Sequence, residues 1–257
     1  MHHAVLICLC GLFLPTQSDE PSSTTAEVSN REAGPQSEGQ HEIRNIEGWT
    51  VHLHRDLLKD APKKTATAMR LMKVQLKRVA DVVPGKALSQ LRKVPIWVNP
   101  KYPNASPRAE YHPGAGWLKN NGRDPVMAKA VEVTNVSMFE FEHKRMPYLM
   151  LHELAHAYHD RVLGFSHPAI EDTFQQAKAS GTYDSVRRFT GRRYIQDKAY
   201  AMSNAREYFA EGSEALFGKN DFFPFNQAEL KKHDPDAWHL FTRLWNDPAS
   251  VTDDPPK

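Results

Sequence analysis

The 257-residue chain has little cysteine, little net charge and almost no long hydrophobic run. Its only two cysteines, Cys8 and Cys10, lie near the N-terminus, so no disulfide can stabilise the rest of the chain. The 33 basic and 31 acidic residues leave a net charge of +2, which argues against nucleic-acid binding as the main function. Beyond residue 14, no apolar run has the length of a transmembrane helix. With 40% hydrophobic and 25% charged residues, the composition is that of a soluble protein with one domain, or one domain and an arm.

The apolar run at residues 4–14 is uncharged and has 11 residues, which is too short to span a bilayer comfortably. Pro15 and small polar residues follow it, a pattern typical of a secretory signal peptide over residues 1–18. His2 and His3 stand where Lys or Arg is usual, so a buried N-terminal segment is the alternative. The sequence therefore predicts a secreted or periplasmic protein with no stable membrane insertion after signal cleavage.

Residues 19–40 are rich in Ser, Thr, Glu, Gln, Gly and Pro, and are predicted to form a disordered acidic arm. Five acidic residues against Arg31 give this arm a charge of −4. Because the whole chain carries +2 and residues 1–18 carry no formal charge, residues 41–257 carry +6. This surplus either serves solubility or indicates a preference for acidic substrates. The sequence also leaves open whether the arm acts as a pro-segment.

The hydrophobic pattern of residues 41–257 predicts a single α+β domain with a small N-terminal sheet. The first half is expected to hold helices at 64–79 and 87–92, much loop over 100–126, and strands at 46–53, 94–98, 109–112, 116–118 and 131–136. The second half is expected to be mostly helical, with helices at 147–163, 168–179 and 204–217 and smaller ones through residue 245. Residues 183–195 have no clear period and are left unassigned.

The helix expected at 147–163 contains the motif His152-Glu153-Leu-Ala-His156. Residues four apart share one helix face, so both imidazoles can reach the same metal ion. Glu153 projects beside them, where a carboxylate can take a proton from a water at the metal. A solvated helix face with two surface histidines is the alternative interpretation. The motif predicts a zinc site with Glu153 as general base.

A catalytic zinc normally has three protein ligands and one open position, so a third ligand is required. His159 lies on the same helix, which turns too far between residues 156 and 159 to bring this side chain to the same ion. We expect His159 to be exposed or to contact a ligand without binding the metal. His159 and Val162 stand at the Gly and third His positions of the longer metzincin motif, which excludes that class. A second helix offers Glu207, Glu211 and Glu214. One of these acids can bind metal while another orients an imidazole, or they form a solvated face.

Tyr200 and the block Glu207-Tyr208-Phe-Ala-Glu211, placed after an H-E-x-x-H helix, resemble the catalytic domain of anthrax lethal factor. That domain belongs to the gluzincin metallopeptidases, which have the zincin-like fold. The resemblance covers residues 147–218, and Tyr208 stands where the family has its first Phe. It implies a zincin-like fold for this chain as well.

The resemblance also implies roles for individual residues. It implies three zinc ligands: His152, His156 and Glu207. It implies Glu153 as the general base and Tyr200 as the group that stabilises the oxyanion or the leaving group. It implies that Glu211 supports the ligands without binding the metal itself. Asp160 falls where the family has an acidic residue after the second His of the motif.

The sequence thus predicts a secreted zinc-dependent metallopeptidase that hydrolyses peptide bonds of a peptide or protein substrate. A non-catalytic binding module stabilised by zinc and a zinc amidase acting on a cell-wall peptide are the alternatives. The strand expected at 131–136 is either an edge that binds an extended peptide by strand addition or a plain sheet strand. Cleavage specificity and oligomeric state cannot be predicted from the sequence.

Overall fold

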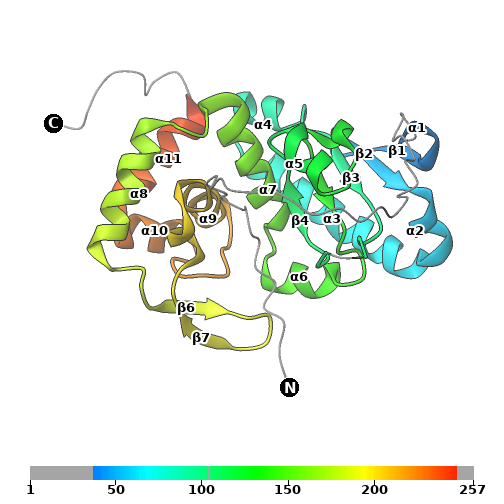
Figure 1. The fold of residues 1–257 in the computed structure, drawn as a ribbon. Helices are drawn as coiled ribbons and strands as arrows, with labels where there is room; N and C mark the ends of the chain where they lie inside the picture. The colour runs from blue at the N-terminus through cyan, green and yellow to red at the C-terminus, as the bar shows by residue number, and fades with distance from the viewer. Residues whose placement is uncertain (1–36, 104, 248–257) are drawn as a thin grey trace, which may run out of the picture.

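The computed structural model describes residues 37–103 and 105–247, so the predicted signal peptide and residues 19–36 of the predicted arm lie outside the described residues. A five-stranded sheet lies at one side and most of the C-terminal helices at the other, with helix α7 (Leu149–Tyr158) between them (Figure 1). Sheet strands come first and helices dominate the second half, which confirms the α+β class. Every helix among the described residues is too short or too polar to span a membrane.

The sheet has the strand order β1-β2-β3-β5-β4. Its strands are β1 (His41–Ile46), β2 (Trp49–His54), β3 (Ile96–Val98), β4 (Ala109–Tyr111) and β5 (Val131–Val133). Strands β2, β3 and β5 are parallel, whereas β1 and β4 run antiparallel to their neighbours at the two edges. The sheet therefore presents β4 as the edge strand next to α7.

Three strand predictions need correction. The predicted strand at 46–53 is the end of β1, a turn at Glu47–Gly48 with positive φ, and β2. The predicted strand at 131–136 ends at Val133 and lies inside the sheet, so its interpretation as an edge was wrong. The residues predicted as a strand at 116–118 lie in helix α5 (Ala115–Asn120). A helix satisfies its own backbone hydrogen bonds, whereas an extended segment there needs a neighbouring strand.

The first half also contains α1 (Ser37–Gln40), α2 (Arg55–Asp60), α3 (Pro62–Val82), α4 (Gly85–Leu91) and the 3-10 turn η1 (Pro125–Met127). Helix α3 begins with Pro62 at its first turn, where proline is tolerated because that N–H has no helical partner. Its buried face carries Met69, Met72, Leu76 and Val79 at helical spacing, as the sequence predicted.

The second half contains α6 (Phe139–Arg145), α7, α8 (Pro168–Ser180), α9 (Ala205–Phe217), α10 (Gln227–His233) and α11 (Pro235–Asn246). Helix α7 continues as a π-helical segment, η2 (His159–Leu163), and ends at Gly164 with φ 84°. The three predicted helices are thus present. The unassigned residues form a hairpin of β6 (Val186–Phe189) and β7 (Tyr194–Asp197), followed by the 3-10 turn η3 (Tyr200–Ser203).

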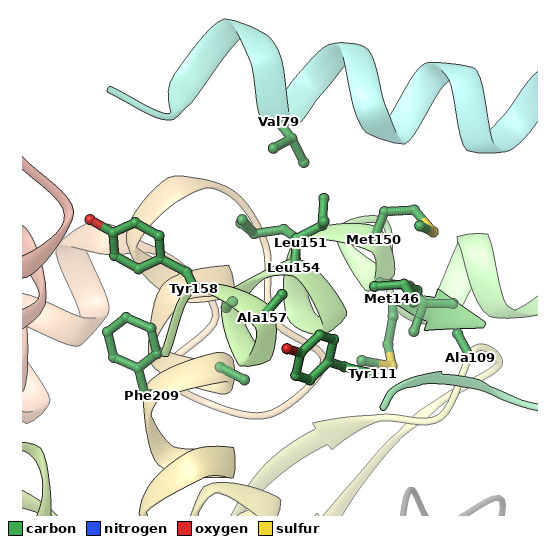
Figure 2. Close-up of a cluster of buried hydrophobic side chains, with 14 of the residues drawn as sticks. Val79, Ala109, Tyr111, Met146, Met150, Leu151, Leu154, Ala157, Tyr158 and Phe209 are labelled. Atoms are coloured by element: carbon green, nitrogen blue, oxygen red, sulfur yellow. The ribbon is translucent and has the colours of Figure 1, made fainter. Parts of the chain in front are cut away.

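All ten residues of α7 are buried. Figure 2 shows Leu151 and Leu154 facing Val79 of α3, while Tyr158 lies at the other end of the helix. The Tyr158 ring stacks on Trp245 of α11 with centroids 4.3 Å apart. Because α7 is enclosed, each of its polar side chains must find a partner inside the protein or be left unpaired at a cost.

Candidate metal centre

Two helices bring together the three predicted zinc ligands. His152 and His156 lie one turn apart on α7, and Glu207 lies in the first turn of α9. The Nε2 atoms of the two histidines are 3.1 Å apart, and the Glu207 Oε2 atom lies 3.1 Å from His152 Nε2 and 3.3 Å from His156 Nε2. The Asn204 side chain caps α9 by accepting hydrogen bonds from the N–H groups of Arg206 and Glu207.

The spacing of these three atoms fits a tetrahedral zinc ion. Ligand atoms about 2.0–2.1 Å from one ion, at tetrahedral angles, lie roughly 3.3 Å from one another. Glu207 is fully buried, and its Oε1 atom has no hydrogen-bond partner in the described part of the chain. A cation between the three groups would give that carboxylate the partner it lacks. The donor set of two imidazoles and one carboxylate is one that zinc accepts in catalytic sites.

The charges support the same arrangement. Burial raises the pKa of Glu207, but the adjacent His156 and His152 rings outweigh it and hold that pKa well below its usual range. The carboxylate is therefore ionised beside the two imidazoles.

His152 is oriented by Glu214. The Glu214 Oε1 atom lies 2.9 Å from His152 Nδ1, whereas Glu211 Oε1 lies 4.0 Å from the same nitrogen. When Nε2 of His152 faces a metal, Nδ1 carries the proton and donates a hydrogen bond to Glu214. Glu211, which the family resemblance had placed behind the ligands, instead accepts a hydrogen bond from the Asn220 side chain at 2.9 Å. Burial, with Asp221 and Glu214 nearby, raises the pKa of Glu211 well above its usual range.

Glu153 points toward the edge strand β4. Its Oε2 atom accepts a hydrogen bond of 2.9 Å from the backbone N–H of Tyr111 on β4. Burial raises the pKa of Glu153 above its usual range, which suits a group that must take up a proton near neutral pH. The candidate base is therefore oriented by a backbone N–H of the edge strand.

Asp160 supports the same strand rather than the ligands. Its Oδ2 atom accepts a hydrogen bond of 2.7 Å from the Tyr111 hydroxyl and lies 2.5 Å from the Lys129 Nζ. Tyr111 thus contacts the α7–η2 helix at two residues, Glu153 and Asp160. At a rise of 1.5 Å per residue, these two residues lie about 10 Å apart along the helix axis. The two contacts set both the position and the direction of β4 relative to the helix.

Tyr200 begins the 3-10 turn η3, directly before the helix that carries Glu207. The side chain is half-buried and packs against the main hydrophobic core. The chain order Tyr200, Asn204, Glu207 therefore places the predicted oxyanion stabiliser and the third ligand at the same end of α9.

His159 is not exposed, contrary to one of the two sequence-based expectations for it. The side chain is fully buried between the rings of Phe165 and Phe209, with centroids 5.3 and 5.1 Å away. Both ring nitrogens have no hydrogen-bond partner among the described residues, and burial lowers the pKa of His159 to about 3. The helix changes to π geometry at this residue and directs the ring into the core.

A second set of residues with metal-ligand spacing was not predicted. The acids Glu110 and Glu132 are paired on the neighbouring strands β4 and β5 and lie near His112. The Arg123 guanidinium contacts both acids, at 2.9 Å from Glu132 Oε2, and lies 4.6 Å from the Tyr102 ring centre. A side-chain cation already occupies this cluster, so it serves as a buried ion-pair network under the loop after β3.

The chain matches no protein-family model and no curated protein. A search of solved structures finds a likeness to the PRO-PRO endopeptidase PPEP-2 from Paenibacillus alvei, with 18% identity and a TM-score of 0.41. The match covers 70% of this chain and 90% of that chain. At this identity and TM-score, the likeness assigns no activity to the present chain.

Proposed function

We propose that the protein is a secreted zinc-dependent metallopeptidase of the gluzincin type, with a zincin-like fold. The observation that carries the proposal is the convergence of His152, His156 and Glu207 at the spacing of zinc ligands, with Glu153 buried beside them. The apolar run at residues 4–14 supports secretion. A bound zinc ion would supply a Lewis acid that activates water near neutral pH and polarises the substrate carbonyl.

The residues of the chain then have distinct tasks in hydrolysis. Glu153, oriented by the Tyr111 N–H, takes a proton from the attacking water as its oxygen bonds to the carbonyl carbon. As the C–N bond breaks, Glu153 returns that proton to the amine that leaves. Tyr200 donates a hydrogen bond to the developing oxyanion or to the leaving group. Glu214 keeps His152 in the tautomer that presents Nε2 as a ligand.

The ligand set favours catalysis over a purely structural metal. A structural zinc site is normally closed by four protein ligands, whereas a catalytic site keeps one position open. The group of His152, His156 and Glu207 offers three ligands within the described residues. A buried carboxylate next to such a group has a task in hydrolysis but none in a closed site.

The test of this proposal is Glu153→Gln combined with metal analysis. The variant should bind as much zinc as the wild type and unfold at the same temperature, because Glu153 is not a ligand. Its hydrolysis of a peptide library should fall by roughly 10²–10⁴-fold, the range expected on loss of a general base. Full activity in the variant would refute the assignment of Glu153. Cleavage of cell-wall peptides in place of the library would favour the amidase.

A further inference from the structure

The hairpin of β6 and β7 is strongly basic. Its residues 186–197 contain four arginines and a single acid, which leaves a net charge of +3: Arg187, Arg188, Arg192 and Arg193 against Asp197. The turn of the hairpin is closed by a hydrogen bond of 2.9 Å from the Thr190 N–H to the Arg193 carbonyl, and Gly191 supplies the positive φ that the turn requires. The positive charge is therefore displayed on a hydrogen-bonded hairpin.

Part of this charge is not neutralised by the protein. Arg188 pairs with Asp197 at 2.9 Å and lies 3.7 Å from Asp221. By contrast, Arg187, Arg192 and Arg193 are exposed, and none of them has a carboxylate partner in residues 37–103 or 105–247. Neighbouring like charges repel one another, so a surface that keeps them unpaired is suited to an anionic partner.

Aromatic rings hold the Arg187 side chain in a position where it can bind an anionic partner. Its guanidinium lies 4.5 Å from the centre of the Tyr194 ring and 5.8 Å from that of Phe225, while Tyr194 is 47% exposed. Lys219 lies 5.8 Å from the centre of the Phe189 ring on a neighbouring segment. A guanidinium that stacks on a ring keeps its N–H edge for a carboxylate and loses less side-chain entropy on binding.

The hairpin adjoins the segments that lead to the metal centre. After β7, only Lys198 and Ala199 separate it from Tyr200. At its turn, the Gly191 backbone lies against the ring of Phe141 on α6, the helix that precedes α7. Figure 1 shows the turn of the hairpin directed toward α6. The hairpin therefore borders, at its turn and at its C-terminal end, the segments that precede the two helices of the metal centre.

We propose that the β6–β7 hairpin binds an acidic segment of the polypeptide substrate, through Arg187, Arg192 and Arg193. This inference rests on the proposed peptidase function, because it places the partner in the substrate itself. The hairpin would raise the rate of productive encounter and hold the substrate beside the centre, while His152, His156 and Glu153 perform the hydrolysis. The hairpin holds +3 of the net +6 charge of residues 41–257.

The test compares two fluorescent peptides of equal length that share one core sequence, extended by five Glu or by five Gln. Binding is measured by anisotropy with the full chain carrying Glu153→Gln, in low and in high salt. We expect the Glu peptide to bind at least tenfold more tightly in low salt, and this preference to weaken strongly as salt rises. Adding R192Q and R193Q should remove most of the preference and leave binding of the Gln peptide unchanged.

The matched control is K59Q with K63Q, which removes two exposed positive charges from α2 and α3 (Figure 1). It should keep the preference for the Glu peptide. Equal affinities for the two peptides, or an equal loss in the control, would overturn the proposal, as would equally tight binding of vesicles rich in anionic lipid. Hydrolysis of a peptide library by the wild-type chain separates the two proposals. If the wild type cleaves no member of the library, the peptidase function is refuted, while the binding comparison remains valid.

Discussion

The contact between Glu214 and His152 allows a sharp test of how the metal centre is supported. Glu214→Gln keeps an oxygen that can accept a hydrogen bond from His152 Nδ1 but removes the carboxyl group 2.9 Å from that nitrogen. Loss of a carboxylate partner behind a liganding histidine typically weakens metal binding 10- to 100-fold. Because the glutamine retains an acceptor, we expect the lower limit, about tenfold, or about 1.4 kcal/mol.

Zinc binding to the folded chain alone raises its free energy of unfolding, so the same substitution should also reduce thermal stability in zinc. A loss of about 1.4 kcal/mol in a protein of this size lowers the melting temperature by about 3–6 °C. In excess chelator the wild type and the variant should differ much less. Zinc affinity is measured by competition with a chromophoric chelator, and melting by calorimetry with zinc and with chelator.

Glu211→Gln is the matched control. It makes the same chemical change one turn away on α9, but the Glu211 carboxylate lies 4.0 Å from His152 Nδ1 and is engaged by Asn220. We expect its zinc affinity to stay within about threefold of the wild type, since the liganding imidazole keeps its partner. Tenfold weaker binding in the Glu211 variant, with an unchanged Glu214 variant, would refute the assignment and restore the expectation from the family resemblance.

Tyr111→Phe removes the hydroxyl that contacts Asp160 but keeps the backbone N–H that holds Glu153. We expect kcat to fall several-fold while the zinc content stays unchanged. An unchanged kcat would show that the Asp160 contact does not position β4. Tyr200→Phe should lower kcat roughly 10²–10³-fold with little change in KM, as for other oxyanion donors, and an unchanged kcat would remove Tyr200 from the mechanism. The pKa of His159 is about 3 in the folded protein and near 6.5 when unfolded, so its neutral form stabilises the fold above pH 6.5 and that stability is lost as the pH falls toward 3. In chelator, urea unfolding at pH 7 and pH 4 should therefore show the wild type losing about 3 kcal/mol more than His159→Leu; equal losses would place the His159 ring in contact with solvent.

Local features of the sequence determined much of the fold and the central part of the site. The apolar spacing of α3 and the Asn204 cap of α9 depend on neighbours within a few residues, so the sequence predicts them directly. The same holds for His152 and His156, because residues four apart on a helix share a face in any protein. Asn204 also fixes where α9 begins, and hence that Glu207 lies in its first turn.

The short elements of the first half were predicted less well. A run such as Val131–Val133 indicates a strand, but not whether other strands lie on both sides of it. That depends on contacts with β3 and β4, which are distant in sequence. Residues 116–118 are ambiguous for the same reason, since a few residues stabilise neither a strand nor a helix by themselves.

Tertiary structure alone decided which of several equivalent residues supports the centre. One face of α9 carries Glu207, Glu211 and Glu214. Their spacing does not show which of them binds the metal and which supports a liganding histidine. The angle and offset at which α9 packs on α7 place Glu214, rather than Glu211, within hydrogen-bond distance of His152. In the same way, the packing of β4 on α7 turned Asp160 toward Tyr111. The sequence determines which side chains share a face of an element, whereas side-chain partners within a few ångströms depend on how elements distant in sequence pack together.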